Sequence, residues 1–316
     1  MTLRLPLRVG TRGSPLALAQ AHMVKAALLA AEPSLDDDAI EIVVVSTQGD
    51  RVQDRTLAEI GGKGLFTEEI EAGLLQGNLD LAVHSMKDMP TLLPDGLVIS
   101  AVLPRADPRD ALIARGPRSV AELPRGAVVG TASLRRHAQL SAVRPDLVVV
   151  PLRGNVQTRL RKLDAGEVQA TFLAMAGLIR LGLEHVVSAA LEPEEMLPAV
   201  AQGAIGIECR ADDPPVLELL ARINHAPTLT SITTERAFLG ALDGSCRTPI
   251  AALAELDGAS LRLRGLVATP SGRAIDRIEA SGDAATCAAV GAETGARLRA
   301  RLGPEYAAAW PGAPPG

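Results

Sequence analysis

The stretch GTASLRRHAQLSAVRPDLVVVPLRGNVQTRLR (130–161) decides how this sequence is interpreted. It contains six arginines, at positions 135, 136, 144, 153, 159 and 161, and one acid, Asp146, within a chain whose formal net charge is -5. Its pattern predicts short apolar strands at 127–130 and 147–151, each followed by a helix, at 133–142 and 155–165. Strand ends and helix N-termini bind anions in α/β proteins, and arginine suits carboxylate or phosphate. The stretch therefore predicts an anion site, with a solvated helix face as the alternative.

Composition limits the classes of function. The chain has 316 residues, which predicts two or three domains, and 47% of them are hydrophobic, enough for buried cores. Aromatic residues make up only 2%, so platforms for stacking nucleic-acid bases are not expected. A basic cleft in an acidic protein points instead to a small anionic ligand, and no nucleic acid is expected as a partner.

The cysteines and the termini indicate the compartment. Cys209, Cys246 and Cys287 lie far apart without a CxxC pair, and the five histidines form no HExxH motif, so neither a disulfide framework nor a metal site is predicted. The first twenty residues lack a leader-like apolar core, and no uncharged apolar run reaches 18 residues. We therefore expect a cytoplasmic protein without a membrane partner, and a disordered tail at about 307–316.

A second stretch resembles the first. VGTRGSPLALAQ (9–20) and VGTASLRRHAQL (129–140) both read as a strand end, Gly-Thr, serine and a helix. Ser14 is a predicted N-cap, and Pro15 occupies the first helical position. The match predicts two similarly built α/β halves that face one cleft, each with a helix N-terminus and arginine.

Further patterns complete the predicted elements. Strands are expected at 40–46, 79–84, 97–103, 110–114, 169–175 and 204–209, and helices at 65–76, 176–183, 215–223 and 228–241. PRADPR (104–109) reads as a crossing between the halves, to the first of which 204–223 returns. Strands at 250–256, 261–269 and 275–281 and a helix at 284–302 predict a small α+β domain. The glycine-rich segment before residue 65 reads as a lid and not as a phosphate loop, because Leu57 and Gly64 break that motif.

One acidic residue is the best candidate for a catalytic carboxylate. Asp88 lies in SMKDMP (85–90), directly after a predicted buried strand, and Lys87 precedes it. The chain has only four lysines against 28 arginines, which makes Lys63 and Lys87 unusual at predicted cleft positions. The alternative is a turn in which the Asp88 carboxylate caps backbone N–H groups.

Eight blocks together resemble the porphobilinogen deaminase (hydroxymethylbilane synthase) family. They are TRGSPLAL (11–18), GGKGLF (61–66), AVHSMKDMP (82–90), DPRDA (107–111), GTASLRR (130–136), LRGNVQTRL (152–160), AVAQGAIGIECR (199–210) and GSC (244–246). The blocks follow the order and spacing of the family over roughly residues 8–250. The C-terminal part fits with weaker motifs.

The resemblance implies an α/β fold of three domains. Two are lobes like periplasmic binding proteins, with doubly wound mixed sheets, at 1–104 with 200–224 and at 105–199. The third, at 225–316, is a small domain with an antiparallel three-stranded sheet. The implied reaction joins four porphobilinogen units with loss of ammonia into a linear tetrapyrrole, in tetrapyrrole and heme biosynthesis. The implied cofactor is a dipyrromethane primer, bound through a thioether.

The resemblance also implies the site residues. Cys246 matches the attachment cysteine and Asp88 the catalytic aspartate, which would stabilise the cation left by ammonia and pass protons. The other positions that match cofactor contacts are Lys87, Thr131, Ser133, Arg135, Arg136, Arg153 and Gly154. The positions that match substrate contacts are Arg12, Ser14, Arg153, Arg159 and Gln202, and those of the lid are Lys63 and Phe66.

Two positions depart from the usual family pattern. Ala132 stands in Thr131-Ala132-Ser133 where the family often has a hydroxyl residue, so one hydrogen bond is in doubt. Gln48-Gly49-Asp50 replaces an Arg-Gly-Asp found in some members, which weakens an anion-binding role there. Neither change affects the implied reaction.

The residues leave two other kinds of protein open. One is a non-catalytic two-lobed protein that binds a small polycarboxylate. The other is an anion-binding regulator in which Cys246 is an ordinary buried thiol. The resemblance favours the enzyme and implies no obligatory protein partner, so we expect a monomer.

Overall fold

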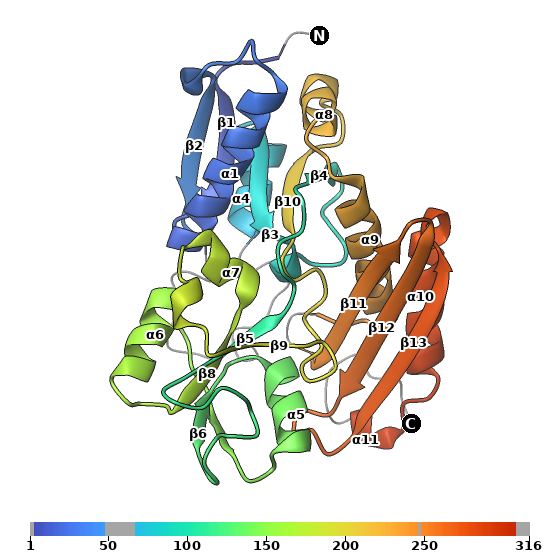
Figure 1. Cartoon of the computed structure of the whole chain (residues 1–316). Coiled ribbons are helices and arrows are strands. Elements are labelled where there is room, and N and C mark those ends of the chain that lie inside the picture. Colours follow the sequence, from blue (N-terminus) through green and yellow to red (C-terminus); the bar gives the residue numbers. More distant parts are fainter. Residues whose placement is uncertain (1–2, 48–66, 246–247, 308–316) are drawn as a thin grey trace. The chain divides into compact units, whose positions relative to one another are not determined.

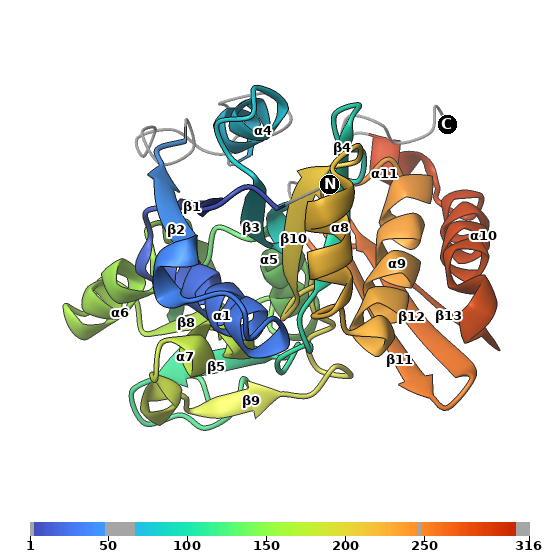
Figure 2. The same cartoon turned by 90° about the horizontal axis from the view of Figure 1, so that it is seen from above.

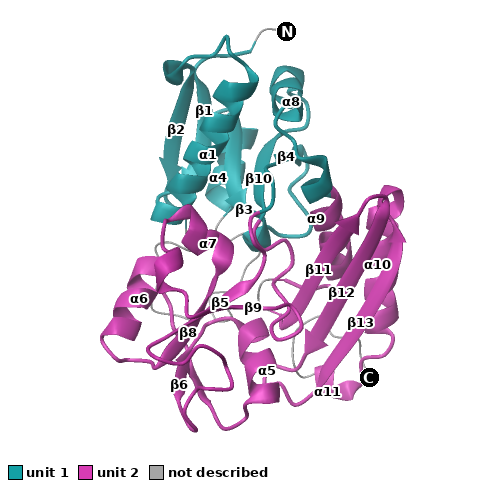
Figure 3. Cartoon of the chain, in the orientation of Figure 1, with its two compact units in different colours: residues 1–105, 204–229 teal, residues 106–203, 230–316 magenta. Residues whose placement is uncertain are grey.

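The chain folds into two compact units (Figure 3). The computed structural model describes residues 3–47, 67–245 and 248–307. Unit 1 comprises Met1–Arg105 and Ala204–Leu229, and unit 2 comprises Ala106–Gly203 and Thr230–Gly316. The first passage between the units lies within the predicted crossing at 104–109. The predicted division into three domains stays a prediction.

Unit 1 is built on a five-stranded mixed sheet with the strand order β2-β1-β3-β10-β4 (Figure 1). The strands are β1 (Leu7–Arg12), β2 (Ile40–Val45), β3 (Leu81–Ser85), β4 (Leu97–Val102) and β10 (Ile205–Arg210). β1 pairs in parallel with β2 and β3, whereas β10 is antiparallel to β3 and β4. The late strand β10 thus returns to the first sheet, as predicted.

Helices cover both faces of this sheet. The helices of unit 1 are α1 (Pro15–Ala31), α4 (Glu68–Leu75) and α8 (Pro214–Ala221), with 3-10 turns η1 (Asp37–Ala39) and η2 (Met86–Asp88). Leu28 of α1 and Leu220 of α8 share one buried cluster with the strands. Ile70 and Leu74 of α4 belong to a second cluster with Ala82 of β3. Because successive side chains of a strand point to opposite faces, α4 lies on the face opposite α1 and α8.

The first sheet of unit 2 has the order β7-β6-β8-β5-β9. Its strands are β5 (Asp110–Ala114), β6 (Val128–Gly130), β7 (Val148–Val150), β8 (Ala170–Ala174) and β9 (Ala189–Leu191). β6 is parallel to β7 and β8, and β5 is antiparallel to β8 and β9. The edge strand β9 was not predicted from the sequence.

The helices α5 (Leu134–Val143), α6 (Val156–Asp164) and α7 (Met175–Arg180) cover this sheet. Leu140 of α5 packs in one buried cluster, and Leu163 of α6 and Leu178 of α7 pack in another. A short 3-10 turn, η3 (Glu184–Val186), precedes β9. The α/β sandwich is therefore of the same kind as in unit 1.

Unit 2 also contains an antiparallel three-stranded sheet, β11-β12-β13. Its strands are β11 (Ile250–Asp257), β12 (Ser260–Ala268) and β13 (Ile275–Asp283), and α9 (Ala226–Ala241), η4 (Ala284–Thr286), α10 (Cys287–Arg299) and α11 (Pro304–Ala307) accompany it. Helices α9 and α10 lie side by side over one face (Figure 2). A Cβ atom at Gly265 would lie 2.4 Å from the ring of Phe238, so glycine lets α9 approach β12 closely.

The two five-stranded sheets have the same topology. Across each sheet in space, three parallel strands lie next to one antiparallel strand, and an edge strand lies beyond it. β6 and α5 thus stand in the second sheet where β1 and α1 stand in the first, which confirms the prediction of two similarly built α/β halves. The predicted fold class, two such lobes and a small α+β part, is confirmed.

Candidate functional site

The turn after β1 brings polar groups to the carboxyl end of the unit 1 sheet. Ser14 caps α1, because its Oγ accepts a hydrogen bond of 3.2 Å from the backbone N–H of Ala17. The buried Thr11 hydroxyl donates to the carbonyl of Ala17 over 3.2 Å. Pro15 begins the helix, as predicted. The turn holds Arg12 and Ser14 at the strand end, where an α/β sheet binds ligands.

A small cavity lies at this end of unit 1. It is lined by Arg12, Ser14, Leu16, Ala17, Gln20, Thr67, Val83, His84, Ser85, Asp88 and Met89. Three of the predicted site residues, Arg12, Ser14 and Asp88, therefore meet at one cavity. Two of the lining side chains bond to each other: Gln20 Nε2 donates to Ser85 Oγ at 2.9 Å, and Ser85 Oγ donates to Gln20 Oε1 at 3.1 Å.

Asp88 ends the turn η2, which follows β3 directly. Its side chain is exposed at the cavity, whereas the preceding Lys87 is half-buried. Among the described residues no backbone N–H donates to the Asp88 carboxylate. The alternative of a capping aspartate therefore has no support in this part of the chain.

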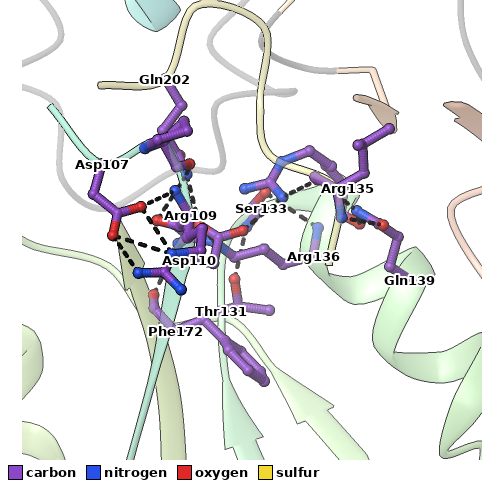
Figure 4. Close-up of polar contacts among 12 residues, drawn as sticks. Asp107, Arg109, Asp110, Thr131, Ser133, Arg135, Arg136, Gln139, Phe172 and Gln202 are labelled. Atoms are coloured by element: carbon purple, nitrogen blue, oxygen red, sulfur yellow. Dashed lines mark hydrogen bonds and ion pairs between the residues drawn. The ribbon is translucent and has the colours of Figure 1, made fainter. Parts of the chain in front are cut away.

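Unit 2 carries a buried cluster around one aspartate (Figure 4). Asp110, the first residue of β5, is fully buried, and the residues Arg135 and Arg136 are 4% and 5% exposed. Asp110 Oδ2 accepts from Arg135 Nη1 at 2.7 Å, and Oδ1 accepts from Arg136 Nη2 at 2.7 Å. Arg135 also donates to the carbonyl of Leu197 and Arg136 to that of Phe172. These two arginines are thus not a solvated helix face.

The cluster holds more positive than negative charge. Two guanidinium groups share one carboxylate, which leaves a surplus of one positive charge away from water. Burial works against the ionised acid, but the charges of Arg135 and Arg136 and their hydrogen bonds outweigh it and hold the pKa of Asp110 well below its usual range. Burial lowers the pKa of Arg135. An anionic ligand near these groups would relieve part of that cost.

Three further predicted residues lie at this cluster. Gln202, which is 1% exposed, donates through Nε2 to Asp110 Oδ1 at 2.9 Å and to the carbonyl of Pro108 at 2.8 Å. Thr131 Oγ1 accepts from the backbone N–H of Ser133 at 3.1 Å, and Ser133 Oγ accepts from that of Arg136 at 3.4 Å. The structure therefore brings Gln202, Thr131 and Ser133 next to the arginine pair.

A second group of predicted residues surrounds the start of α6. Asn155 caps this helix, and Gly154 before it has a φ of 111°, which favours glycine. Arg159 Nε donates to the carbonyl of Gly154 over 2.8 Å, and Arg153 is half-buried beside it. The structure therefore groups Arg153, Gly154 and Arg159 at one helix N-terminus.

The remaining arginines of the 130–161 stretch have other surroundings. Arg144 pairs with Asp146 and donates to the carbonyls of Val120 and Leu123, so it ties the loop before β6 to the end of α5. Arg161 lies in the last turn of α6, where the helix dipole favours a cation. The six arginines therefore do not form one cluster.

Arg180, at the end of α7, belongs among the candidates, although the sequence did not single it out. Its Nη2 donates to the carbonyl of Gly203 over 2.6 Å, and its buried Nε has no hydrogen-bond partner among the described residues. Burial lowers the pKa of Arg180 to about 10. Only the long-range fold reveals this desolvation, since LIRLG resembles an ordinary helix end in the sequence.

Several predicted positions lie outside the described residues: Cys246, Lys63 and Phe66. Cys209 lies fully buried in β10, and burial raises the pKa of its thiol to about 11. Cys287 begins α10 and is half-buried. Cys209 belongs to the buried core cluster of unit 1, whereas the packing of Cys287 stays a prediction.

Within the described ranges, no group of three or more histidine, cysteine, aspartate or glutamate side chains could hold a metal ion. No helix among the same residues is long and apolar enough to cross a bilayer.

Solved structures similar to this chain include two proteins of low sequence identity. A periplasmic substrate-binding protein of an ABC transporter from Coxiella burnetii is 16% identical, with a TM-score of 0.43, and the match covers 73% of this chain and 96% of that one. A putative methionine-binding lipoprotein from Bacillus subtilis is 12% identical, with a TM-score of 0.43, over 69% of this chain and 90% of that one.

Comparison at the level of sequence is more specific. Residues 7–218 match the family model described as porphobilinogen deaminase, dipyromethane cofactor binding domain, and residues 229–300 match that of the porphobilinogen deaminase C-terminal domain. A porphobilinogen deaminase from Paracoccus denitrificans is 58% identical over 301 residues, which cover 95% of this chain and 96% of the relative. The chain therefore belongs to the porphobilinogen deaminase family.

Proposed function

We propose that this chain is a hydroxymethylbilane synthase, a transferase of tetrapyrrole biosynthesis. It joins four porphobilinogen units head to tail, releases ammonia and forms a linear tetrapyrrole on a dipyrromethane primer. Membership of the family supports this function over that of a non-catalytic polycarboxylate-binding protein. The structural observation that carries it is the surplus of buried positive charge in unit 2.

This surplus fits the implied cofactor and product. Each pyrrole of these molecules carries an acetate and a propionate, so a growing chain adds two carboxylates per ring. Arg135 and Arg136 share one carboxylate, and Arg180, which is half-buried with a buried Nε, has no acid partner among the described residues. Guanidinium groups pair well with carboxylates, and pairing would offset the cost of their burial. The residues of unit 2 therefore fit a ligand with several carboxylates.

We propose roles for these residues residue by residue. In unit 2 the carboxylates of the cofactor would be held by Arg135, Arg136, Arg153, Thr131, Ser133 and the backbone of Gly154, with Arg159, Arg180 and Gln202 toward the substrate. In unit 1 Lys87 and Asp88 would contact the cofactor, and Arg12 and Ser14 the substrate. Cys246 would carry the primer through a thioether, and Lys63 and Phe66 would belong to a lid. When bound, the dipyrromethane supplies the free ring carbon from which the chain grows.

Asp88 has the chemistry that the reaction needs. Loss of ammonia leaves a cation on porphobilinogen, and a carboxylate held near its pyrrole N–H group stabilises that charge as it develops. The same carboxylate can take the proton that the attacked ring carbon releases when the new carbon–carbon bond forms. Departing ammonia takes up a proton, so the step balances as one proton moved from carbon to nitrogen. The exposure of Asp88 at a cavity lined by Arg12 and Ser14 supports this role.

The remaining properties follow the same proposal. We propose a cytoplasmic monomer that needs no obligatory protein partner and no metal ion. Three domains with the bounds predicted from the sequence would separate two ligand-binding lobes from the part that carries Cys246.

The test combines the intact mass of the purified protein with its turnover of porphobilinogen. We expect the wild-type protein to carry an added mass of two pyrrole units. Asp88→Asn should keep that mass and lose nearly all turnover, because it removes charge and preserves shape. Cys246→Ala should lack both the added mass and the turnover, whereas Cys209→Ala should keep the added mass.

Each variant can contradict its own part of the proposal. Turnover of Asp88→Asn at the wild-type rate would remove Asp88 from the mechanism. Added mass on Cys246→Ala would show that another residue holds the primer. A wild-type protein without added mass or turnover would refute the function itself.

A further inference from the structure

Three ionisable side chains meet in the interior of unit 1. His84 lies on β3 and Glu208 on the neighbouring antiparallel strand β10, where Glu208 pairs with Ala82 and Gly206 pairs with His84. Side chains two positions apart share a face of a sheet, so both point to the face of Ala82, which α4 covers. Glu71 of α4 approaches from that side. His84 and Glu71 are each 6% exposed and Glu208 is fully buried.

The hydrogen bonds of this cluster are incomplete as long as both acids are ionised. His84 Nε2 lies 2.9 Å from Glu208 Oε2. Glu208 Oε1 and Glu71 Oε1 are both buried and have no hydrogen-bond partner among the described residues. Two carboxylates cannot bond to each other, because an ionised carboxylate only accepts. A proton on one of the two acids would supply the missing donor.

The charges point to Glu71 as the acid that keeps the proton. Burial raises the pKa of Glu71, and the neighbouring charge of Glu208 raises it further, while a hydrogen bond from Thr67 and the proximity of His84 act in the opposite direction. The charge of Glu68, on the same helix, also favours the neutral form of Glu71. Glu208 already has the imidazole of His84 as its hydrogen-bond partner, so Glu71 is the acid left to act as a donor.

We propose that neutral Glu71, ionised Glu208 and His84 form a buried chain that orients the imidazole at the cavity lined by Asp88. The role of His84 in the reaction rests on the proposed function, whereas the proton on Glu71 does not. His84 lines this cavity together with Asp88, Arg12 and Ser14. Because Glu208 engages Nε2, Nδ1 is the ring nitrogen left to exchange a proton with the cavity. His84 is thus a positioning residue that holds a proton near the carboxylate which receives one in every condensation.

The proton on Glu71 can be tested without any activity. A carboxyl group whose folded-state pKa is raised loses stability as the pH rises from its unfolded value, about 4.3, to its folded value. In urea unfolding between about pH 4 and pH 8, we therefore expect the wild type to lose stability relative to Glu71→Gln as the pH rises, because glutamine mimics the neutral acid. Glu68→Gln, an exposed change on the same helix, should show a much smaller trend. A difference between wild type and Glu71→Gln that is constant with pH would overturn the neutral Glu71.

Turnover of porphobilinogen tests the positioning role. We expect Glu208→Gln and His84→Gln to lower kcat at least tenfold with KM nearly unchanged, since the chain holds a proton and not a substrate carboxylate. Glu68→Gln, an exposed change on the same helix as Glu71, should retain kcat within about threefold. An unchanged kcat in both Glu208→Gln and His84→Gln would overturn the positioning role and leave the proposed function standing. If the wild type fails to turn over porphobilinogen, the proposed function and this role fail together, while the unfolding experiment still decides the proton on Glu71.

Discussion

The two strand–turn–helix units, β1 with α1 and β6 with α5, share one topology and carry different charges. In unit 1 the helix begins with Pro15 and Leu16 after an arginine at the strand end. In unit 2 two arginines occupy the first turn of the helix and are buried. The same backbone thus presents one half-buried cation in the first case and a buried cationic pair in the second.

The antiparallel strand of each sheet explains the difference. The first residue of β5, Asp110, pairs with the last residue of β8, and the first residue of β10, Ile205, pairs in the same way with the last residue of β3. Ile205 is apolar and fully buried, whereas Asp110 supplies the carboxylate that two buried guanidinium groups require. One position of a shared topology therefore decides whether a lobe can hold buried arginines.

The largest expected effect comes from removing that carboxylate. Asp110→Asn should lower the free energy of unfolding by about 3–5 kcal/mol, because it leaves two buried cations without a counter-charge. The measurement is urea unfolding near neutral pH. Asp107→Asn is the matched control, since Asp107 pairs with Arg109 in a partly exposed position and should cost much less.

The same variant has a characteristic pH dependence. The folded-state pKa of Asp110 is depressed, so its stabilising contribution is present above the unfolded value, about 3.9, and is lost as the pH falls below it. The difference between wild type and Asp110→Asn should therefore shrink in acid. An equal difference at pH 7 and pH 3 would show that packing, and not charge, accounts for the loss.

Much of the paired architecture could be predicted from the sequence. The Gly-Thr turn, the N-cap serines and the alternation of apolar strands with helices are local signals, and they placed β1, α1, β6 and α5 to within a few residues. The edge strand β9 escaped prediction because its sequence, Ala-Ala-Leu, lacks the β-branched residues that mark the equally short β6 and β7. Asp110 could not be assigned to Arg135 and Arg136 because the contact depends on which strands are neighbours. The proximity of Glu71 to Glu208 escaped for the same reason.

A smaller loss of stability is expected when alanine replaces the glycine at the equivalent position of each turn. A Cβ atom at Gly130 would lie 2.8 Å from both Cβ and Cδ2 of Leu152 and 3.0 Å from Val168 Cγ1. A Cβ atom at Gly10 would lie 2.5 Å from Cδ1 of Leu79, with its other near neighbours at 3.4 Å. Leu79 can move the end of its side chain, but Leu152 Cβ is fixed by the backbone. Gly130→Ala should therefore cost about 1–3 kcal/mol of unfolding free energy, and Gly10→Ala less.

Urea unfolding of the two glycine variants checks this order. A larger loss for Gly10→Ala would mean that the first lobe is packed more rigidly around its turn than the second. In that case the packing around the backbone of the turns, and not the charge of Asp110, would be the main difference between the two lobes.

The smallest effect concerns the serines that cap the two helices. Ser14 Oγ accepts a hydrogen bond of 3.2 Å from the backbone N–H of Ala17. Neither α1 nor α5 has an acidic residue in its first turn that could stabilise the helix N-terminus. The serine cap is therefore a main local stabiliser of each helix start. Ser133 Oγ accepts at a longer 3.4 Å, and the turn before it is also held by Thr131 Oγ1 and by the bonds of Arg135 and Arg136 to Asp110. Ser14→Ala should therefore lower the free energy of unfolding by about 1 kcal/mol in urea, and Ser133→Ala should lower it less.

The same comparison can be repeated in an Asp110→Asn background. There the loss of unfolding free energy caused by Ser133→Ala should rise toward that caused by Ser14→Ala, because the second lobe then depends on its cap as the first does. If the cost of Ser133→Ala is the same in both backgrounds, the buried ion cluster does not hold the start of α5.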